Sequence, residues 1–436
     1  MANNEQVSVT PAAVIEAAEA DVLAKDAQEA KQAAEAETKQ KSIEERTAAL
    51  ESKLKHGDAL VADLEKHMAN PTPQVPTGFR VLDKALGDGL DDGGIPPGLI
   101  TIGAIPSLGK TAIVLQMADQ MAEAGKDVLI IALEMACTEL VARSISRLTA
   151  KHLSSTDLSG EHPAALTAKG VRLFNTRRER VTNQAQANYW DEMADRLAES
   201  VEKYRDAIAP HIYIHEPETP IPASMIKSIV HEYAELLGKT PVVIVDYIQI
   251  LAPEPGNERN TEKANMDAAA LTLKHISRDY KTPVICISSF NRMNYNEQVS
   301  MESFKESGGI EYSSDAVVGM QLYGTGMYIK KGQALDVDFE KSRNPRRIQA
   351  RVLKNRDGIT GEYINFEYFP ACNLFREVSE RPVKTNLEVP EHWKADKPRM
   401  KTTRLDDKDD SGGDAVDPTG IIEAPKKEHK VTSKGK

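Results

Sequence analysis

Residues 99–111 read Leu-Ile-Thr-Ile-Gly-Ala-Ile-Pro-Ser-Leu-Gly-Lys-Thr, and this stretch decides the expected fold. Its first four residues are mostly apolar or β-branched, which predicts a strand over 99–102. A turn that contains Gly103, Pro106 and Gly109 follows, and apolar residues then recur at helical spacing. A strand, a glycine-bearing turn, Gly-Lys-Thr and a helix in this order predict a phosphate-binding loop, or P-loop.

The chemistry of such a loop explains its residue types. Backbone N–H groups and a helix N-terminus present partial positive charge to a polyphosphate. Lys110 would reach the outer phosphates, and Thr111 would ligate Mg²⁺. Ala104 stands where glycine is usual, which is tolerable if its φ stays negative. The candidate nucleotide-binding residues are Gly103, Ala104, Pro106, Ser107, Gly109, Lys110 and Thr111.

Bulk properties limit the class of protein. The 436 residues are enough for one large core or two domains plus tails, but aromatic residues make up only 5%, so part of the chain should lack a core. No apolar run approaches the roughly 20 residues that span a bilayer, and the N-terminus lacks the features of a secretory signal. Three widely spaced cysteines indicate free thiols in a reducing compartment. The net charge of −11 excludes a wholly basic nucleic-acid coat, but not a local basic channel.

Composition divides the chain into three parts. Residues 1–75 are rich in Ala, Glu, Lys and Gln, which predicts a helical extension and linker. Within it, 50–68 carries an apolar stripe that is either a contact with a neighbouring subunit or part of a solvated helix. Residues 76–380 alternate apolar strands with amphipathic helices, which predicts an α/β domain with a mostly parallel central sheet. Residues 381–436 lack an apolar period and are predicted to form a disordered charged tail.

The central part contains six expected parallel strands and a later strand pair. A long charged helical region is expected between the second and third strands, over 138–205. The expected strands are 99–102, 128–133, 212–214, 242–245, 284–287 and 317–322, followed by the pair 351–353 and 363–368.

Two acidic residues follow predicted strands. Asp246 comes directly after 242–245, where a buried strand would deliver its carboxylate to a Mg²⁺ ion. Glu134 comes directly after 128–133, where it could act as a base or orient water for ATP hydrolysis. Spacing alone equally allows Glu134 to be an acidic residue that stabilises a helix dipole.

Three later segments carry polar or charged candidates. Residues 288–292 close the fifth strand and could sense a γ-phosphate. The loop 305–311 contains Lys and two Gly, and such a loop can approach a nucleic-acid backbone, although it could also be an ordinary surface turn. Lys354 and Arg356 lie two residues apart and hence on one strand face. In a ring-shaped ATPase such a pair can reach a neighbour's γ-phosphate, but charge spacing alone favours a solvated strand face.

The order of these motifs resembles the C-terminal motor domain of DnaB-type replicative helicases, which belong to superfamily 4. The resemblance covers residues 76–378, and the family also carries Ala at the position of Ala104. It implies a RecA-like P-loop NTPase fold, a homohexameric ring, Mg-ATP at subunit interfaces and single-stranded DNA in a central channel. The motifs are Thr77–Asp83, the loop 103–111, Leu133–Met135, Asp246–Ile250, Ser288–Arg292, Glu306–Glu311 and Lys354–Gly358.

Carried over by position, the resemblance implies catalytic roles for this chain's residues. Lys110 would bind phosphate, and Thr111 would bind phosphate and metal. Glu134 resembles the family's catalytic glutamate, and Asp246 resembles its Mg²⁺-coordinating acid.

The resemblance also implies contacts beyond the chain's own nucleotide site. Lys354 and Arg356 resemble the pair that acts on a neighbour's nucleotide. Lys305, Glu306 and Gly308 match the DNA-contacting loop.

Two differences from the family stand out. Ser289 takes the place of a usual Gln, and its shorter side chain cannot span the same gap. Residues 1–75 are too short to form the family's globular, primase-binding N-terminal domain.

The resemblance therefore predicts an ATP-dependent DNA helicase that translocates on single-stranded DNA and unwinds duplex during replication. Its expected partners are single-stranded and forked DNA, further copies in a hexamer, and a primase or helicase loader. The protein would be cytoplasmic, encoded by a bacterium or a phage. The alternatives are a RecA-like recombination ATPase without unwinding activity and a degenerate ATPase that acts as a scaffold.

Overall fold

A computed structural model describes residues 28, 31, 35–87, 93–159, 164–290, 296–304, 308–327 and 333–402. The chain divides into two compact units, Met1–Thr72 and Pro73–Lys436. In the first unit, 35–51 is helical and α2 spans Gly57–Ala69, so the predicted helical extension is confirmed there. No residue of α2 is buried, and the apolar side chains of the stripe are exposed.

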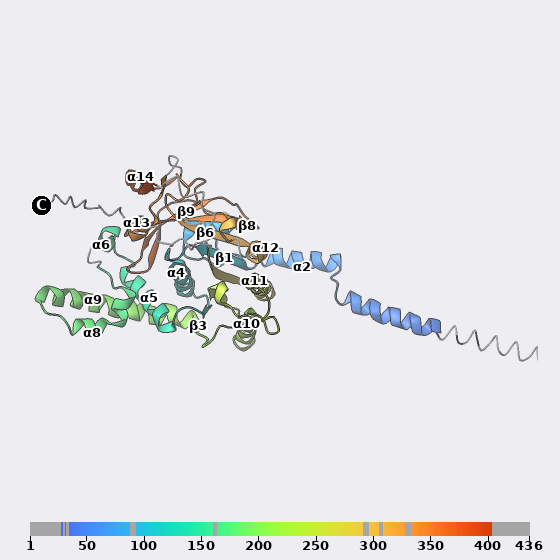
Figure 1. The fold of residues 1–436 in the computed structure, drawn as a ribbon. Helices are drawn as coiled ribbons and strands as arrows, with labels where there is room; N and C mark the ends of the chain where they lie inside the picture. The colour runs from blue at the N-terminus through green and yellow to red at the C-terminus, as the bar shows by residue number, and fades with distance from the viewer. Residues whose placement is uncertain are drawn as a thin grey trace, which may run out of the picture. The chain divides into compact units, whose positions relative to one another are not determined.

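The second unit is built on a mixed sheet of nine described strands in the order β10-β9-β8-β6-β1-β5-β4-β2-β3. Figure 1 shows this sheet with helices packed around it. The strands from β6 to β3 pair in parallel, whereas β8, β9 and β10 pair antiparallel, so the predicted mostly parallel α/β sheet is confirmed. The strands are β1 Gly98–Ala104, β2 Val128–Ala132, β3 Ile212–His215, β4 Val242–Asp246, β5 Pro283–Ser289, β6 Ala316–Leu322, β8 Arg346–Asn355, β9 Tyr363–Phe369 and β10 Leu374–Glu377.

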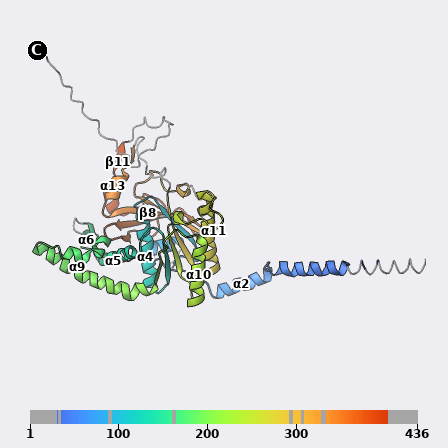
Figure 2. The ribbon, with the colours of Figure 1, turned by 60° about the horizontal axis from the view of Figure 1, so that its bottom comes forward.

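Helices cover both faces of this sheet. The chain passes from β1 through β2 to β3 in one direction across the sheet, and from β3 through β4 to β5 in the opposite direction. Because crossovers between parallel strands are right-handed, the helices of the first passage lie on one face and those of the second on the other. Accordingly α4 (Lys110–Glu123) and α5 (Cys137–Ala150) lie on one side, and α10 (Ala223–Leu237) and α11 (Glu262–Tyr280) on the other (Figure 2). The other α-helices are α3 Arg80–Leu86, α6 Ser155–Ser159, α7 Ala168–Arg172, α8 Phe174–Arg178, α9 Gln184–Lys203, α12 Gly308–Ser313, α13 Val337–Ser342 and α14 Glu391–Ala395.

Short one-turn segments complete the secondary structure. They are η1 Tyr204–Ile208, η2 Ala209–His211, η3 Ile248–Ile250 and η5 Met301–Phe304. None of the described helices is long and apolar enough to cross a membrane.

The predicted start of the disordered tail, at residue 381, is wrong. Residues 381–402 are ordered: they contain α14 and β11 (Met400–Thr402), which pairs with β7 (Gln333–Leu335). Trp393 is 1% exposed and packs against Tyr323. This anchoring depends on one aromatic side chain and on charge contacts, which leave no apolar period for sequence analysis to detect. The rest of the predicted tail, 403–436, lies outside the described residues.

β1 is buried along its whole length and extends two residues beyond the predicted strand. Gly103 therefore lies in the strand and not in the turn. A Cβ atom at Gly103 would lie 2.2 Å from Phe304 Cε1 and 2.5 Å from Phe290 Cε1, and these two rings pack edge to face. Glycine is needed here because two aromatic side chains press on the strand.

Gly103→Ala should therefore destabilise the second unit. Forcing a methyl group into a packed core typically costs about 1–3 kcal/mol. Urea unfolding of the variant should show a lower midpoint. Gly57→Ala is the control, because nothing lies within 4 Å of the position of its added Cβ. Equal midpoints for wild type and Gly103→Ala would contradict this packing.

Candidate nucleotide-binding site

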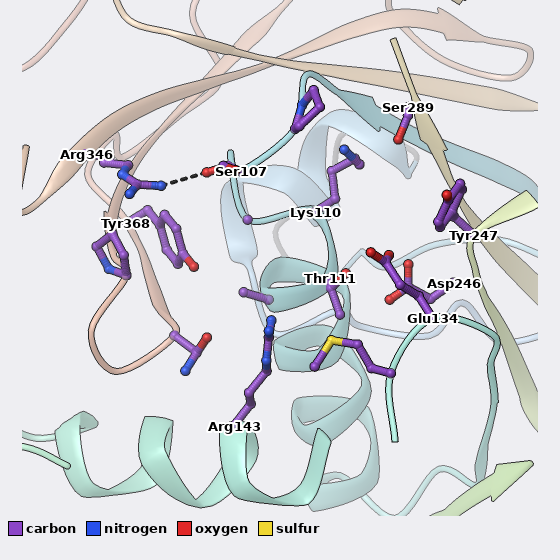
Figure 3. Close-up of a pocket in the computed structure, with 16 residues that line it drawn as sticks. Ser107, Lys110, Thr111, Glu134, Arg143, Asp246, Tyr247, Ser289, Arg346 and Tyr368 are labelled. Carbon is purple, nitrogen blue, oxygen red and sulfur yellow. Dashed lines mark hydrogen bonds between the residues drawn. The ribbon is translucent and has the colours of Figure 1, made fainter. Parts of the chain in front are cut away.

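The strand order brings the predicted site residues together at one edge of the sheet. The P-loop follows β1, Ser289 ends β5, Asp246 ends β4 and Glu134 lies two residues after β2, and these four strands are neighbours in that order. They border a cavity of about 590 Å³ (Figure 3). Its lining comprises Pro106, Ser107, Gly109, Lys110, Thr111, Ala112, Glu134, Met135, Arg143, Asp246, Tyr247, Ser289, Arg346, Tyr368, Pro370 and Asn373.

The P-loop turns through two residues with positive φ, Ser107 at 66° and Gly109 at 91°. Gly109 is the N-cap of α4 and has no side chain to cap the helix. A Cβ atom at this position would lie 2.9 Å from the rings of Phe375 and Tyr368. Both the backbone conformation and the close packing therefore call for glycine, and the N-terminus of α4 is left to face the cavity.

Lys110 folds back onto its own loop. Its Nζ donates to the carbonyl oxygens of Ala104 at 3.0 Å and Ile105 at 3.4 Å. Burial lowers the pKa of Lys110 to about 8, against the opposing effect of Asp246 and Glu134. Gly103 and Ala104, both predicted to bind nucleotide, are not among the described residues that line the cavity, although the Ala104 carbonyl accepts the hydrogen bond from Lys110.

Asp246 offers a ligand atom for a metal ion. Burial raises the pKa of its carboxyl group to about 6, although a hydrogen bond from Thr111 works in the opposite direction. Its Oδ1 is buried and has no hydrogen-bond partner among the described residues. A hydroxyl and a carboxylate are hard oxygen ligands of the kind that Mg²⁺ takes, with the remaining positions left to phosphates and water. The predicted metal pair, Thr111 and Asp246, therefore fits Mg²⁺.

Glu134 is exposed and lies beside Asp246 on the same wall of the cavity (Figure 3). The residue before it, Leu133, donates its N–H to the carbonyl of Asp246 at 3.1 Å. This backbone hydrogen bond holds the residues that follow β2 beside the last residue of β4. Glu134 therefore faces the same space as Lys110 and Thr111.

Among the lining residues that sequence reasoning missed are three large polar side chains on the opposite wall or floor of the cavity. Arg143 comes from α5, Arg346 from the start of β8 and Tyr368 from β9 (Figure 3). Arg346 donates to the carbonyl of Ser107 at 2.6 Å, and its guanidinium lies 5.8 Å from the centre of the Tyr368 ring. No local pattern marks these residues, because distant segments bring them to the P-loop.

Ser289 lies on the cavity wall, as predicted for the end of the fifth strand. Gln249, which follows β4, donates from Nε2 to Ser288 Oγ at 2.8 Å and approaches the backbone of Ser289 at 3.4 Å. A glutamine side chain therefore joins β4 and β5 although residue 289 itself is short.

Lys354 and Arg356 do not reach this cavity. β8 runs antiparallel to β6, and Asn355 pairs with Ala316 at the start of β6, so the pair lies at the opposite edge of the sheet. Lys354 Nζ donates to the carbonyl of Glu311 at 2.5 Å. Arg356 Nη1 lies 3.3 Å from Asp315 Oδ1, and its side chain is half exposed.

The predicted DNA-binding residues are only partly described. Lys305 and Glu306 lie outside the described residues. Gly308 begins α12, and the next N–H, of Gly309, donates to Asp267 Oδ1 at 2.7 Å. The turn after this loop is thereby attached to α11, and its contact with DNA stays a prediction.

The chain is similar to known proteins in sequence and in fold. Residues 74–377 match the family model of the DnaB-like helicase C-terminal domain. The replicative DNA helicase DnaB of Helicobacter pylori (strain ATCC 700392 / 26695) is 22% identical over 352 residues, which are 74% of this chain and 62% of that protein. This chain therefore covers less than two thirds of that relative.

Two solved structures share the fold. One is an ATPase domain, which aligns with a TM-score of 0.55 at 20% identity, over 74% of this chain and all of that domain. The other is a DnaB-like replicative helicase, described with its interactions with primase, which aligns with a TM-score of 0.54 at 20% identity, over 76% of this chain and 70% of that one. Because the family model matches most of this chain, the chain belongs to the DnaB-like helicase C-terminal domain family.

Proposed function

We propose that the protein is an ATP-dependent DNA helicase that hydrolyses ATP where two subunits meet, translocates on single-stranded DNA and unwinds duplex during replication. The observation that carries this proposal is the cavity itself. In a chain of this family, it gathers Lys110, the pair Thr111 and Asp246, and the exposed acidic side chain of Glu134 at one sheet edge.

Each wall of the cavity has its own part in this proposal. Lys110 exchanges its loop carbonyls for the outer phosphates, and Glu134 orients and deprotonates the attacking water. Mg²⁺, held by Thr111 and Asp246, would neutralise phosphate charge when bound. The far wall, with Tyr368 and Arg346, takes the nucleoside, because an aromatic ring and a guanidinium offer stacking surfaces.

The site is completed by a second copy of the chain. Lys354 and Arg356 lie at the opposite edge of the sheet from their own cavity, so they can act only on a neighbour's nucleotide. A head-to-tail contact of this kind closes into a ring when the rotation between subunits allows it. The proposed assembly is a homohexamer.

The proposed partners follow from the same assignment. Lys305, Glu306 and Gly308 contact the backbone of single-stranded DNA, and forked DNA is the substrate for unwinding. A primase or a helicase loader binds the assembled ring. The proposed location is the cytoplasm of a bacterium, with either the bacterium or a phage as the source.

Nucleotide affinity should be highest between about pH 6 and pH 8. Below the raised pKa of Asp246, about 6, protonation removes the charge that attracts Mg²⁺. Above the lowered pKa of Lys110, about 8, the free protein loses the charge that attracts phosphate. Titration with a fluorescent ATP analogue and Mg²⁺ should show affinity falling by up to about tenfold per pH unit outside this window. Lys110→Arg should lose the upper limb, because arginine stays charged. A flat profile from pH 5 to pH 9 would contradict both assignments.

Glu134→Gln should bind ATP normally but hydrolyse it at least about 10²-fold more slowly, because the amide cannot accept the water's proton. The wild-type protein should separate a forked duplex in a strand-displacement assay, and this variant should not. Near-normal hydrolysis by this variant would reject the catalytic role of Glu134. Wild-type hydrolysis on single-stranded DNA without any strand displacement would favour the recombination ATPase instead.

Mixing two inactive variants should restore activity. Arg356→Ala subunits keep an intact cavity, and Lys110→Ala subunits keep an intact arginine. In a mixed ring the second type can supply its arginine to the first, and such residues contribute roughly 10³–10⁵ in rate. ATPase activity should therefore rise as the two proteins are mixed. Confirmed mixed rings without any recovery would refute catalysis between subunits.

A further inference from the structure

The short segment that carries Glu134 is attached to neighbouring strands at both ends. Before Glu134, the N–H of Leu133 donates to the carbonyl of Asp246 at 3.1 Å. After it, the N–H of Cys137 donates to Glu216 Oε2 at 2.8 Å. Glu134 and Met135, which lie between the two attachments, both line the cavity.

The second attachment replaces a missing helix cap. α5 begins at Cys137, and its N-cap, Ala136, has no side chain that could accept a hydrogen bond. Glu216 lies directly after β3, and β3 pairs with β2 so that His215 is opposite Ile131. This register brings the carboxylate of Glu216 to the free N-terminus of α5, where a negative charge is favourable.

The Cys137 side chain lies close to the same carboxylate. The thiol and the backbone N–H of Cys137 lower the pKa of the Glu216 carboxyl. Burial and the nearby carboxylate raise the pKa of the Cys137 thiol to about 11, so the thiol stays protonated. The first turn of α5 is thus held to the end of β3 by the backbone hydrogen bond of Cys137, with an uncharged thiol beside the carboxylate.

We propose that Glu216 is a positioning residue for ATP hydrolysis: through Cys137 it holds the first turn of α5, and with it Glu134, at the edge of the cavity. Arg143 lies on the same helix and lines the same cavity, so it depends on the same attachment. Misplacing a catalytic group by about 1 Å can cost up to 10²-fold in rate. This inference rests on the proposed hydrolysis at Glu134.

The chain offers a matched control. Glu254 Oε1 accepts the N–H of Ser224 at 3.0 Å, at the N-terminus of α10. Its role at that helix is the same, but no residue of α10 lines the cavity. Glu216→Ala and Glu254→Ala therefore remove the same kind of helix cap, in one case at the helix that follows Glu134 and in the other at a helix that contributes no residue to the cavity.

Glu216→Ala should lower kcat about tenfold while the Kd for an ATP analogue changes less than twofold, because Lys110 and Thr111 belong to another loop. Cys137→Ser should keep kcat within twofold, since its backbone N–H still donates to Glu216. Glu254→Ala should lower Tm as much as Glu216→Ala does and leave kcat unchanged. An unchanged kcat in Glu216→Ala, or an equal fall in Glu254→Ala, would overturn the proposal.

Alkylation of Cys137 tests the contact without relying on turnover. Cys286 and Cys372 are buried, so iodoacetamide in the folded protein should modify Cys137 alone. Glu216→Ala should accelerate this modification several-fold, and Glu254→Ala should not; equal rates would show that the contact is absent. Absence of wild-type ATPase activity would refute the proposed function, whereas normal wild-type activity with an unaffected Glu216→Ala variant would refute only this inference.

Discussion

Parallel pairing at the centre of the sheet is the constraint on which the site depends. Ala104, the last residue of β1, pairs with Ser289, and Ala132, the last residue of β2, pairs with Asp246. The strand ends are therefore level, and the residues that follow them face one cavity. A slip of one residue in either pair would turn the side chains to the opposite face of the sheet. The buried, apolar strands on both sides of β1 fix this register, so the core of the fold also aligns the chemistry.

Sequence patterns revealed the parts of the site whose signals are local. The P-loop and the strand-end positions of Glu134 and Asp246 follow from short apolar runs with a polar residue at the end, and the structure brings them together as expected. Arg346 and Tyr368 could not be found in this way, because they face the P-loop only after β8 and β9 have paired with the rest of the sheet. The interpretation of Gly103 failed for the opposite reason. Its place in the P-loop motif predicted a contact with phosphate, whereas the structure shows that two aromatic rings distant in sequence leave no room for a side chain there.

β8 extends from the nucleotide cavity to the opposite edge of the sheet. Its first residue, Arg346, contacts the P-loop of its own cavity, and Arg356 follows its last residue at the far edge of the sheet. At about 3.4 Å per residue, the two arginines are separated by roughly 30 Å. Arg356 meanwhile pairs with Asp315, which also binds Lys274 and the N–H of Leu99. A half-exposed ion pair of this kind contributes only about 0.2–1 kcal/mol, so little stability would be lost if Arg356 turned to a neighbour's phosphate as proposed.

The short side chain at Ser289 shifts one connection to another residue. A long side chain at this position would itself reach across from β5, but Ser289 does not extend far enough. Gln249 makes the connection from the β4 side, because it follows Asp246, the last residue of β4, by three residues. Its amide contacts Ser288 Oγ and the backbone of Ser289, at the end of β5. The end of β4, where Asp246 lies, is therefore attached to the end of β5 through one glutamine. The sequence continues from β5 to Lys305 and Glu306, so in the proposed helicase this contact would couple the nucleotide site to the DNA-binding loop.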